Sequence, residues 1–123
     1  MESGHVWGRV SVNIRNMNKR LILQRNEPIQ DEGGGYTDTW VTMDEMYGDR
    51  KPAGARELSF AQQNSFTVSH IVIIRMREDI ERGMRFLEGE REFEIKYFHA
   101  HDSRERFLKI YCQEGPVIDG RPL

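Results

Sequence analysis

The segment NEPIQDEGGGYTDT, residues 26–39, carries four carboxylates and three consecutive glycines, and it contains no Lys or Arg. Glycine-rich loops hold phosphate groups through backbone N–H groups, and closely spaced carboxylates hold divalent cations. A glycine-rich segment can also do no chemistry and serve as a flexible arm. The residues that would carry any of these roles are Glu27, Asp31, Glu32, Gly33, Gly34, Gly35, Tyr36 and Asp38.

Charge and spacing both disfavour phosphate binding by this segment. Four carboxylates in a segment that contains no Lys or Arg repel a phosphate group. Dinucleotide-binding loops require G-x-G-x-x-G at the start of a helix, and nucleotide triphosphate loops require a Lys after the last glycine. Here the glycines lead into a predicted strand and no Lys follows them. We therefore predict that the protein binds no nucleotide or other cofactor.

The acidic segment and a histidine pair are the two places where a metal ion could bind. A calcium-binding EF-hand loop needs acids at alternating positions, a Gly at the sixth and a Glu at the twelfth, and the segment lacks that spacing. His99 and His101 would share one face of a strand, but only Asp102 stands nearby as a further ligand. We favour a polar hairpin end over a metal site, and we predict no metal.

No residue pattern points to an activated nucleophile. Cys112 lies in the apolar stripe of a predicted strand, where a buried thiol is unreactive. Ser59 and Ser65 lack the G-x-S-x-G pattern of a nucleophile elbow. We therefore predict that the protein is not an enzyme and has no catalytic residue.

Composition limits the class of partner. The 123 residues fit one domain and carry a net charge of −2, which argues against a general nucleic-acid binder. No apolar run approaches the ~18 residues of a membrane span, so we expect no membrane partner. The first residues lack a signal-peptide core, and the single Cys allows no internal disulfide. We therefore expect synthesis and use in a cytoplasm.

The elements that must position these residues are mainly strands. Alternating apolar residues and β-branched runs predict strands at residues 19–25, 40–47, 66–76, 84–98 and 106–112. Glu88-Gly89 predicts a tight turn that folds the fourth of these into a hairpin. Val72 and Ile74 share one face of the third strand and Ile71 and Ile73 the other, so we expect this strand to be covered on both sides.

One short helix interrupts the strands. Ala55, Leu58 and Ala61 recur every three residues after Pro52 and predict an apolar stripe on a helix over residues 55–63. Residues 78–82 are compatible with a second short helical turn. Consecutive strands with short links predict a mainly β fold, a small closed antiparallel β-barrel of about six strands with one short inserted helix.

Five strings in order resemble those of a known family. They are NKRLILQR at 18–25, GGGYTDTWV at 33–41, GARELSFAQQ at 54–63, SHIVIIRMRE at 69–78 and GMRFLEGEREFEI at 83–95. Their order and spacing resemble those of the head-closure proteins of long-tailed bacteriophages, which are also called head–tail joining or stopper proteins. The resemblance covers residues 17 to 114 approximately, and residues 1–16 are extra relative to it.

The resemblance implies a non-enzymatic structural protein of the virion, located in the neck between head and tail. Such proteins assemble as a ring, dodecameric in relatives, between a portal-bound adaptor protein and a tail terminator or tail tube protein. The ring closes the portal channel after DNA packaging and provides the tail attachment surface. Double-stranded DNA passes through it without specific binding. Assembly would take place in the host bacterial cytoplasm.

The resemblance also divides the chain and implies its functional surfaces. Residues 17–114 would form the head-closure barrel and residues 115–123 a loose tail. Residues 1–16 are an arm or an extra strand, since Val10, Val12 and Ile14 alternate. In relatives the long loop between the first two strands projects toward the channel, so residues 26–39 are the candidate plug. The alternative for this loop is an ordinary mobile hairpin.

Subunit or adaptor contacts are expected from the helix and from exposed aromatic residues. The candidates are Trp40, Arg56, Glu57, Phe60, Gln62 and Gln63, with Tyr36, Phe66 and Phe98 as further aromatic residues. Two other functions remain open. One is a different neck component, such as a tail terminator or tail completion protein. The other is a small β-barrel that binds nucleic acid.

Overall fold

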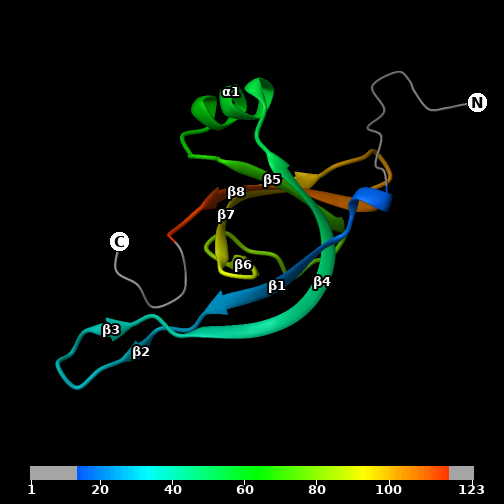
Figure 1. Cartoon of the computed structure of the whole chain (residues 1–123). Coiled ribbons are helices and arrows are strands. Elements are labelled where there is room, and N and C mark those ends of the chain that lie inside the picture. The colour runs from blue at the N-terminus through cyan, green and yellow to red at the C-terminus, as the bar shows by residue number, and fades with distance from the viewer. Residues whose placement is uncertain (1–13, 117–123) are drawn as a thin grey trace, which may run out of the picture.

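Alternating apolar side chains close six antiparallel strands into a barrel, which confirms the predicted fold class. The computed structural model describes residues 14–116. Around the barrel the strands follow one another as β1 (Lys19–Asn26), β4 (Trp40–Pro52), β5 (His70–Arg75), β8 (Phe107–Glu114), β7 (Arg91–Ala100) and β6 (Arg85–Glu88) (Figure 1). β6 pairs with β1 and closes the ring of strands, so each of the six barrel strands has two neighbours.

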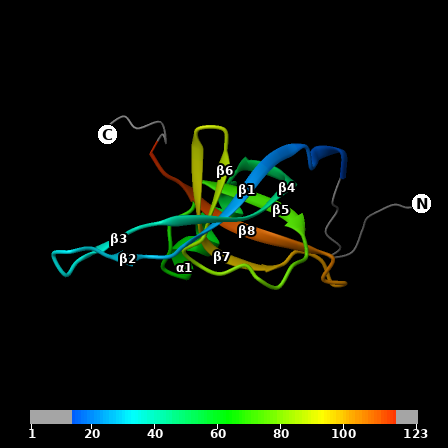
Figure 2. The same ribbon diagram turned by 90° about the horizontal axis from the view of Figure 1, so that it is seen from below.

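Four further elements of the described chain lie outside the barrel wall. β2 (Ile29–Gln30) and β3 (Tyr36–Thr37) form a separate two-stranded hairpin between β1 and β4. Helix α1 (Ala55–Gln63) lies between β4 and β5, and a single 3-10 turn, η1 (Ile14–Asn16), precedes β1. Figures 1 and 2 show the hairpin projecting clear of the barrel, away from η1. No helix among residues 14–116 has the length and apolar character needed to cross a membrane.

The barrel interior is filled by one face of each strand. Phe86 of β6 and Phe93 of β7 stand opposite each other in the register, and both are fully buried. Leu21 and Leu23 of β1 pack into the same cluster. The cluster is completed by Val72, Ile74, Ile80, Met84, Ile95, Leu108, Ile110 and Cys112.

A second apolar cluster lies between the barrel and α1. Ile71 and Ile73 point outward from β5 and pack with Ala61 of the helix and Tyr111 of β8. Val72 and Ile74 belong to the barrel interior, so β5 is buried on both faces at its centre. This two-sided burial explains its uninterrupted apolar run and confirms the expectation for the strand.

β4 curves around the barrel and changes partner at Gly48. Residues 40–48 of β4 pair with β1, whereas its last four residues, Asp49 to Pro52, pair with β5. A Cβ atom on Gly48 would lie 2.8 Å from the backbone oxygen of Ile73 and 2.9 Å from Cγ2 of Ile74. Only glycine therefore lets β4 approach β5 closely enough to close this side of the barrel.

Several predicted boundaries shift in the structure. β5 begins at His70 rather than Phe66, because the chain leaving α1 first turns and the Phe66 N–H donates to the Ala61 carbonyl. β4 is longer than predicted and continues to Pro52. The hairpin at Glu88-Gly89 is confirmed, with Gly89 at positive φ and Glu88 opposite Arg91.

The predicted apolar stripe of the helix is confirmed only at Ala61, which is buried. Ala55 is exposed and Leu58 is half exposed, whereas Phe60, which was not in the predicted stripe, packs with Ala61 against the barrel. Residues 78–82 form no helix, although Ile80 is buried in the barrel cluster. Ile14 lies in η1 rather than in a strand, while Val10 and Val12 fall outside the described residues. Residues 117–123 of the predicted tail also lie outside the described residues. The first residue of that tail, Gly115, donates its N–H to the Glu92 carbonyl at 2.8 Å.

Substituting Gly48→Ala tests the close approach of β4 to β5. We expect a loss of roughly 1–3 kcal/mol in the free energy of unfolding, because the new methyl group overlaps backbone that cannot move independently of the sheet. Gly33→Ala is the matched control, since its Cβ would meet only Asp31 Oδ1 at an ordinary 3.5 Å. Chemical denaturation of both variants measures the difference. Equal stability of the two would contradict the role assigned to Gly48.

Candidate assembly surfaces

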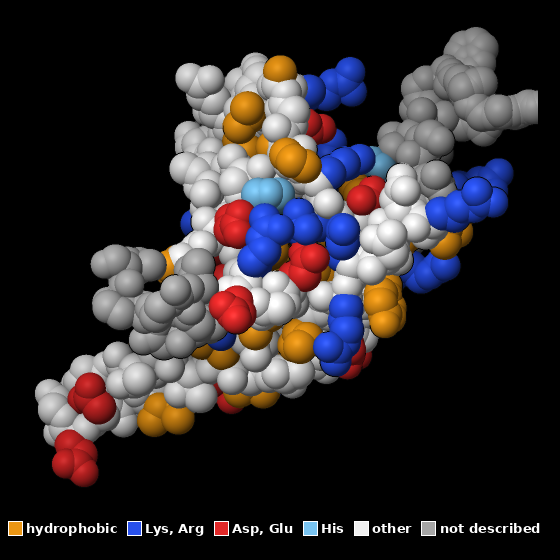
Figure 3. All heavy atoms as spheres, viewed as in Figure 1, with side chains coloured by type: hydrophobic (Ala, Val, Ile, Leu, Met, Phe, Trp, Pro, Cys, Tyr) orange, Lys and Arg blue, Asp and Glu red, His pale blue; other side chains and the backbone are white. Residues whose placement is uncertain are grey.

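The β2–β3 hairpin is the most exposed part of the described chain. Every residue from Glu27 to Asp38 is exposed, including Tyr36 at 70% and Ile29 at 58%. Ile29 stands opposite Thr37 and Tyr36 opposite Gln30, so each face of the hairpin carries one large apolar side chain. Figure 3 shows acidic side chains at the far end of this hairpin, whereas Lys and Arg gather over the barrel. The hairpin is therefore an acidic arm with apolar side chains on both faces.

Asp31 fastens the turn at the tip of the hairpin. Its Oδ1 accepts hydrogen bonds from the Gly33 and Gly35 N–H groups, both at 2.9 Å. The Asp31 N–H donates to the Gly35 carbonyl at 2.8 Å, and Gly34 adopts a φ of +87° that favours glycine. The glycines thus build a defined turn around one carboxylate.

Residues 14–116 contain no group of three side chains suited to hold a metal ion.

The base of the hairpin is held to the barrel by paired polar groups. Asn26 Nδ2 donates to Asp38 Oδ1 at 3.0 Å, and the Glu27 N–H donates to the Thr39 carbonyl at 2.6 Å. Arg25 forms an ion pair with Glu27. Glu32 is consequently the one hairpin carboxylate without a hydrogen-bond or ion-pair partner within the described part of the chain.

Trp40 lies at the root of the hairpin and is partly covered. The Arg85 guanidinium lies over its ring, 4.1 Å from the centroid. Arg85 Nε also donates to Gln24 Oε1 at 2.8 Å, and Arg85 pairs with Glu92 at 3.1 Å. The expected contact residue Trp40 is thus half-buried by its own subunit.

Helix α1 uses two of the predicted contact residues internally. Glu57 Oε1 accepts the Gly54 N–H at 2.9 Å at the start of the helix, and Glu57 Oε2 accepts Lys109 Nζ at 2.9 Å. The ring of Phe60 stacks on Tyr111 with centroids 5.2 Å apart. Glu57 and Phe60 therefore hold the helix on the barrel, and the helix presents Arg56, Leu58, Gln62 and Gln63 outward.

The other aromatic candidates also differ in exposure. Phe66 stacks against Tyr97 with centroids 5.3 Å apart and belongs to the cluster beneath the helix. Phe98 is partly buried and packs against the barrel interior. Tyr36 alone among the predicted aromatic contacts is largely exposed, and Tyr47 of β4, which was not predicted as a contact, is 60% exposed.

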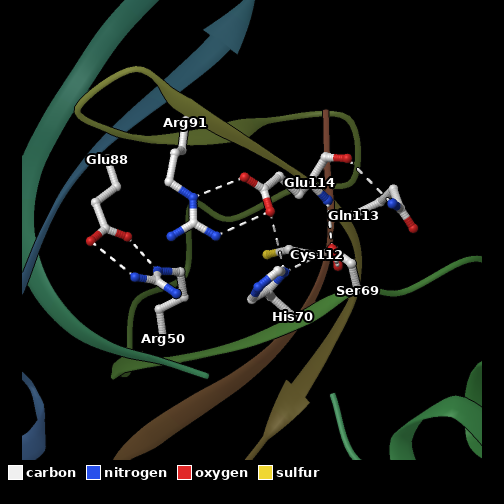
Figure 4. A network of polar contacts seen from close by, with 8 residues as sticks. All are labelled: Arg50, Ser69, His70, Glu88, Arg91, Cys112, Gln113 and Glu114. Atoms are coloured by element: carbon white, nitrogen blue, oxygen red, sulfur yellow. Dashed lines mark hydrogen bonds and ion pairs between the residues drawn. The ribbon is translucent and has the colours of Figure 1, made fainter. Parts of the chain in front are cut away.

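A network of charged residues covers one end of the barrel interior (Figure 4). Arg91 Nε and Nη2 donate to the two oxygens of Glu114 at 2.8 and 3.1 Å, and Arg50 pairs with Glu88. Both guanidinium groups also lie over the buried ring of Phe93, at 5.1 and 5.6 Å from its centroid. Sequence reasoning missed this network, because its members come from five strands and meet only through the register.

Ser69, His70 and Glu114 in this network do not form a catalytic triad. Ser69 Oγ lies 2.9 Å from His70 Nδ1, and Glu114 Oε1 lies 3.9 Å from the same nitrogen. A triad needs the hydroxyl and the carboxylate on opposite ring nitrogens. Ser69 Oγ also accepts the Glu114 N–H at 2.7 Å, and burial lowers the pKa of His70. These three residues join the start of β5 to the end of β8, and this geometry does not activate the Ser69 hydroxyl as a nucleophile.

His99, His101 and Cys112 have surroundings that do not suit metal binding or nucleophilic attack. His99 places its Nδ1 2.7 Å from the Ala100 carbonyl and its Nε2 3.1 Å from the Tyr111 hydroxyl. Burial is the largest cause of the lowered pKa of His101. Cys112 is fully buried, and burial raises the pKa of its thiol. These geometries provide neither a metal site nor a thiolate.

The ion pair of Glu57 and Lys109 gives a pH-dependent prediction. The hydrogen bond from Lys109 lowers the pKa of Glu57 below its ordinary value near 4.5. Its stabilisation is therefore present above pH 4.5 and is lost as the pH falls through the lowered folded-state pKa. Glu57→Gln should lose roughly 1 kcal/mol at pH 7, and the difference from the unchanged protein should vanish in acid.

Denaturant midpoints at several pH values measure that difference. Glu90→Gln is the control, because Glu90 is exposed on the β6–β7 turn. A deficit of the Glu57 variant that stays constant down to pH 3 would show that the ion pair contributes nothing.

Comparisons with known proteins agree with the fold and give the family. A solution structure of protein SF1141 from Shigella flexneri 2a superposes with a TM-score of 0.66 at 21% identity, covering 85% of this chain and 97% of that one. A chain from the virion of a native gene transfer agent particle superposes with a TM-score of 0.58 at 19% identity, covering 83% and 96%.

No curated protein matches the chain. Residues 12–115, most of the sequence, match the model of the phage head completion protein family. The chain therefore belongs to the phage head completion protein family, and it is a structural protein of the phage head and tail.

Proposed function

We propose that this protein assembles into a ring beneath the portal, closes the DNA channel after packaging and presents the surface to which the tail attaches. The observation that carries the proposal is the acidic hairpin. It extends beyond the barrel, and it holds Glu27, Asp31, Glu32 and Asp38 with no cation from residue 26 to residue 39 (Figures 1 and 3). A ring of such subunits brings many copies of this arm together around one axis.

The negative charge of the hairpin is compatible with a surface along which DNA moves without binding. DNA phosphates are repelled by carboxylates, so the hairpin does not retain DNA by nonspecific electrostatic binding. Crowded carboxylates also repel one another, and closure therefore needs cationic or hydrogen-bonding partners on neighbouring subunits. The outer edges of β2 and β3 pair with no described strand and offer backbone groups for such contacts.

Helix α1 supplies the second surface of the proposal. Its outward side chains Arg56, Gln62 and Gln63 are exposed, and Leu58 adds an apolar side chain that is 50% exposed. The adaptor below the portal and the tail terminator or tail tube are the partners that this proposal assigns to the ring. The hairpin precedes β4 and the helix follows it, so one subunit can offer the hairpin to the channel and the helix to the adaptor or tail.

A nucleic-acid-binding barrel is the less favoured alternative. Such proteins stack bases on exposed aromatic rings placed among cations. Here Phe60, Phe66, Tyr97 and Tyr111 pack against one another between the helix and the barrel. The most exposed aromatic ring, Tyr36, lies on the acidic hairpin.

Deleting the gene from its phage tests the proposal at the level of the particle. We expect heads that package DNA and then lose it, beside complete unattached tails, when the lysate is imaged by electron microscopy. Normal joined virions would overturn the proposal. Filled stable heads carrying aberrant tails would move the protein to the tail side of the neck.

Shortening the hairpin tests whether it retains DNA in the head. A variant with residues 30–36 replaced by Asn-Gly should still fold, because the barrel contains none of them, but its heads should lose DNA before tails attach. Asp31→Asn is the matched control, since the amide oxygen can still accept the Gly33 and Gly35 N–H groups. Particles that keep their DNA with the shortened hairpin would exclude a plug.

A further inference from the structure

The barrel wall has a seam between β4 and β5. The two strands pair only from Asp49 to Pro52 of β4, and residues 40–48 pair with β1 on one edge and with no described strand on the other. On the N-terminal side of Gly48, β4 no longer pairs with β5, and a groove of about 330 Å³ lies there. It is lined by Met46, Tyr47, Ile74, Arg75, Met76 and Arg77. This seam groove combines an apolar surface with an unpaired strand edge.

The floor and rim of the seam groove differ in chemistry. Met46 and Met76 are partly buried and pack against the barrel interior, so their flexible thioethers form an adaptable apolar floor. Tyr47 is 60% exposed at the groove. An unpaired edge beside such a floor fits an extended segment that adds a strand and inserts an apolar side chain.

The charge at the rim specifies the segment further. Arg77 is already paired with Asp44 and Asp79. Arg75 is exposed, lies over the Phe107 ring at 5.7 Å, and pairs with no carboxylate among residues 14–116. The groove therefore fits an acidic strand with an exposed aromatic or aliphatic side chain.

The chain itself carries a segment with these properties. The β2–β3 hairpin has unpaired outer edges, exposed Ile29 and Tyr36, and the unpartnered carboxylate of Glu32. Of the five large apolar side chains exposed in the described residues, two lie on the hairpin and one lines the seam groove. Because the hairpin projects away from its own barrel, the groove that receives it belongs to another molecule (Figures 1 and 2).

We infer that the seam groove binds the β2–β3 hairpin of a second copy of this chain, which adds a strand to the free edge of β4. Tyr36 of the second copy lies over Met46 and Met76, and its Glu32 pairs with Arg75. The contact joins two different surfaces, so it repeats from copy to copy and closes into a ring if the rotation allows. The inference rests on the ring of the proposed function and gives each hairpin a specific partner.

Cross-linking in assembled phage particles tests the inference. Thr37→Cys places a thiol on the hairpin and Tyr47→Cys places one at the groove, while the native Cys112 is fully buried and supplies no background. A short bismaleimide should link the double variant into a ladder of dimers and larger products. Pairing Thr37→Cys with Ser103→Cys, in the exposed 101–106 turn, is the control and should give no ladder.

Charge reversal identifies the ion pair. Arg75→Glu should suppress the ladder of the double cysteine variant, and adding Glu32→Arg should restore it. Both side chains are exposed, so the unfolding midpoint of each variant should match that of the parent. A ladder unaffected by Arg75→Glu, or one equally strong with Thr37→Cys alone, would overturn the assignment of the groove.

The outcomes separate this inference from the proposed function. If no ladder forms while the hairpin-shortened heads still leak DNA, the seam groove is wrong and channel closure stands. If the ladder forms and those heads keep their DNA, the contact stands, but the hairpin neither plugs the channel nor is needed for assembly.

Discussion

The close contact between β4 and β5 at Gly48 is the constraint on which the rest of the structure depends. β4 is thirteen residues long, and it pairs with β1 along its first part and with β5 along its last four residues. The change of partner occurs at Gly48, where the absence of a side chain allows the backbones of β4 and β5 to approach closely. That crossing closes the barrel over its apolar interior. On the N-terminal side of Gly48, β4 does not pair with β5, and the seam groove lies there.

The same strand places both candidate surfaces. The hairpin leads into β4 at Trp40, and α1 follows it after Pro52. Each surface is then fixed by polar contacts with the barrel: Asn26 with Asp38 at the hairpin base, and Glu57 with Lys109 under the helix. One strand, β4, therefore links the hairpin and the helix in this chain.

The sequence predicted what depends on local pattern. Alternation predicted the strands, the two-sided burial of β5 and the hairpin at Gly89, because period-two burial and turn chemistry are properties of neighbouring residues. It failed for the helix, whose buried face is chosen by Phe60 stacking on Tyr111, fifty-one positions away in the chain. The pairs of Arg50 with Glu88 and Arg91 with Glu114 were equally out of reach, since they exist only once six strands are in register. Asp31 was predicted only as one of several carboxylates of the loop, and its role in fastening the tip depends on a turn conformation that composition does not reveal.

The burial of Cys112 has a consequence for the lifetime of the particle. A virus that persists between hosts is exposed to oxygen and peroxide, and thiolates at subunit contacts are oxidised first. The only thiol of this chain has no exposed surface and a raised pKa, so it stays protonated and out of reach of oxidants. Copies of this chain therefore cannot become cross-linked through Cys112 during storage.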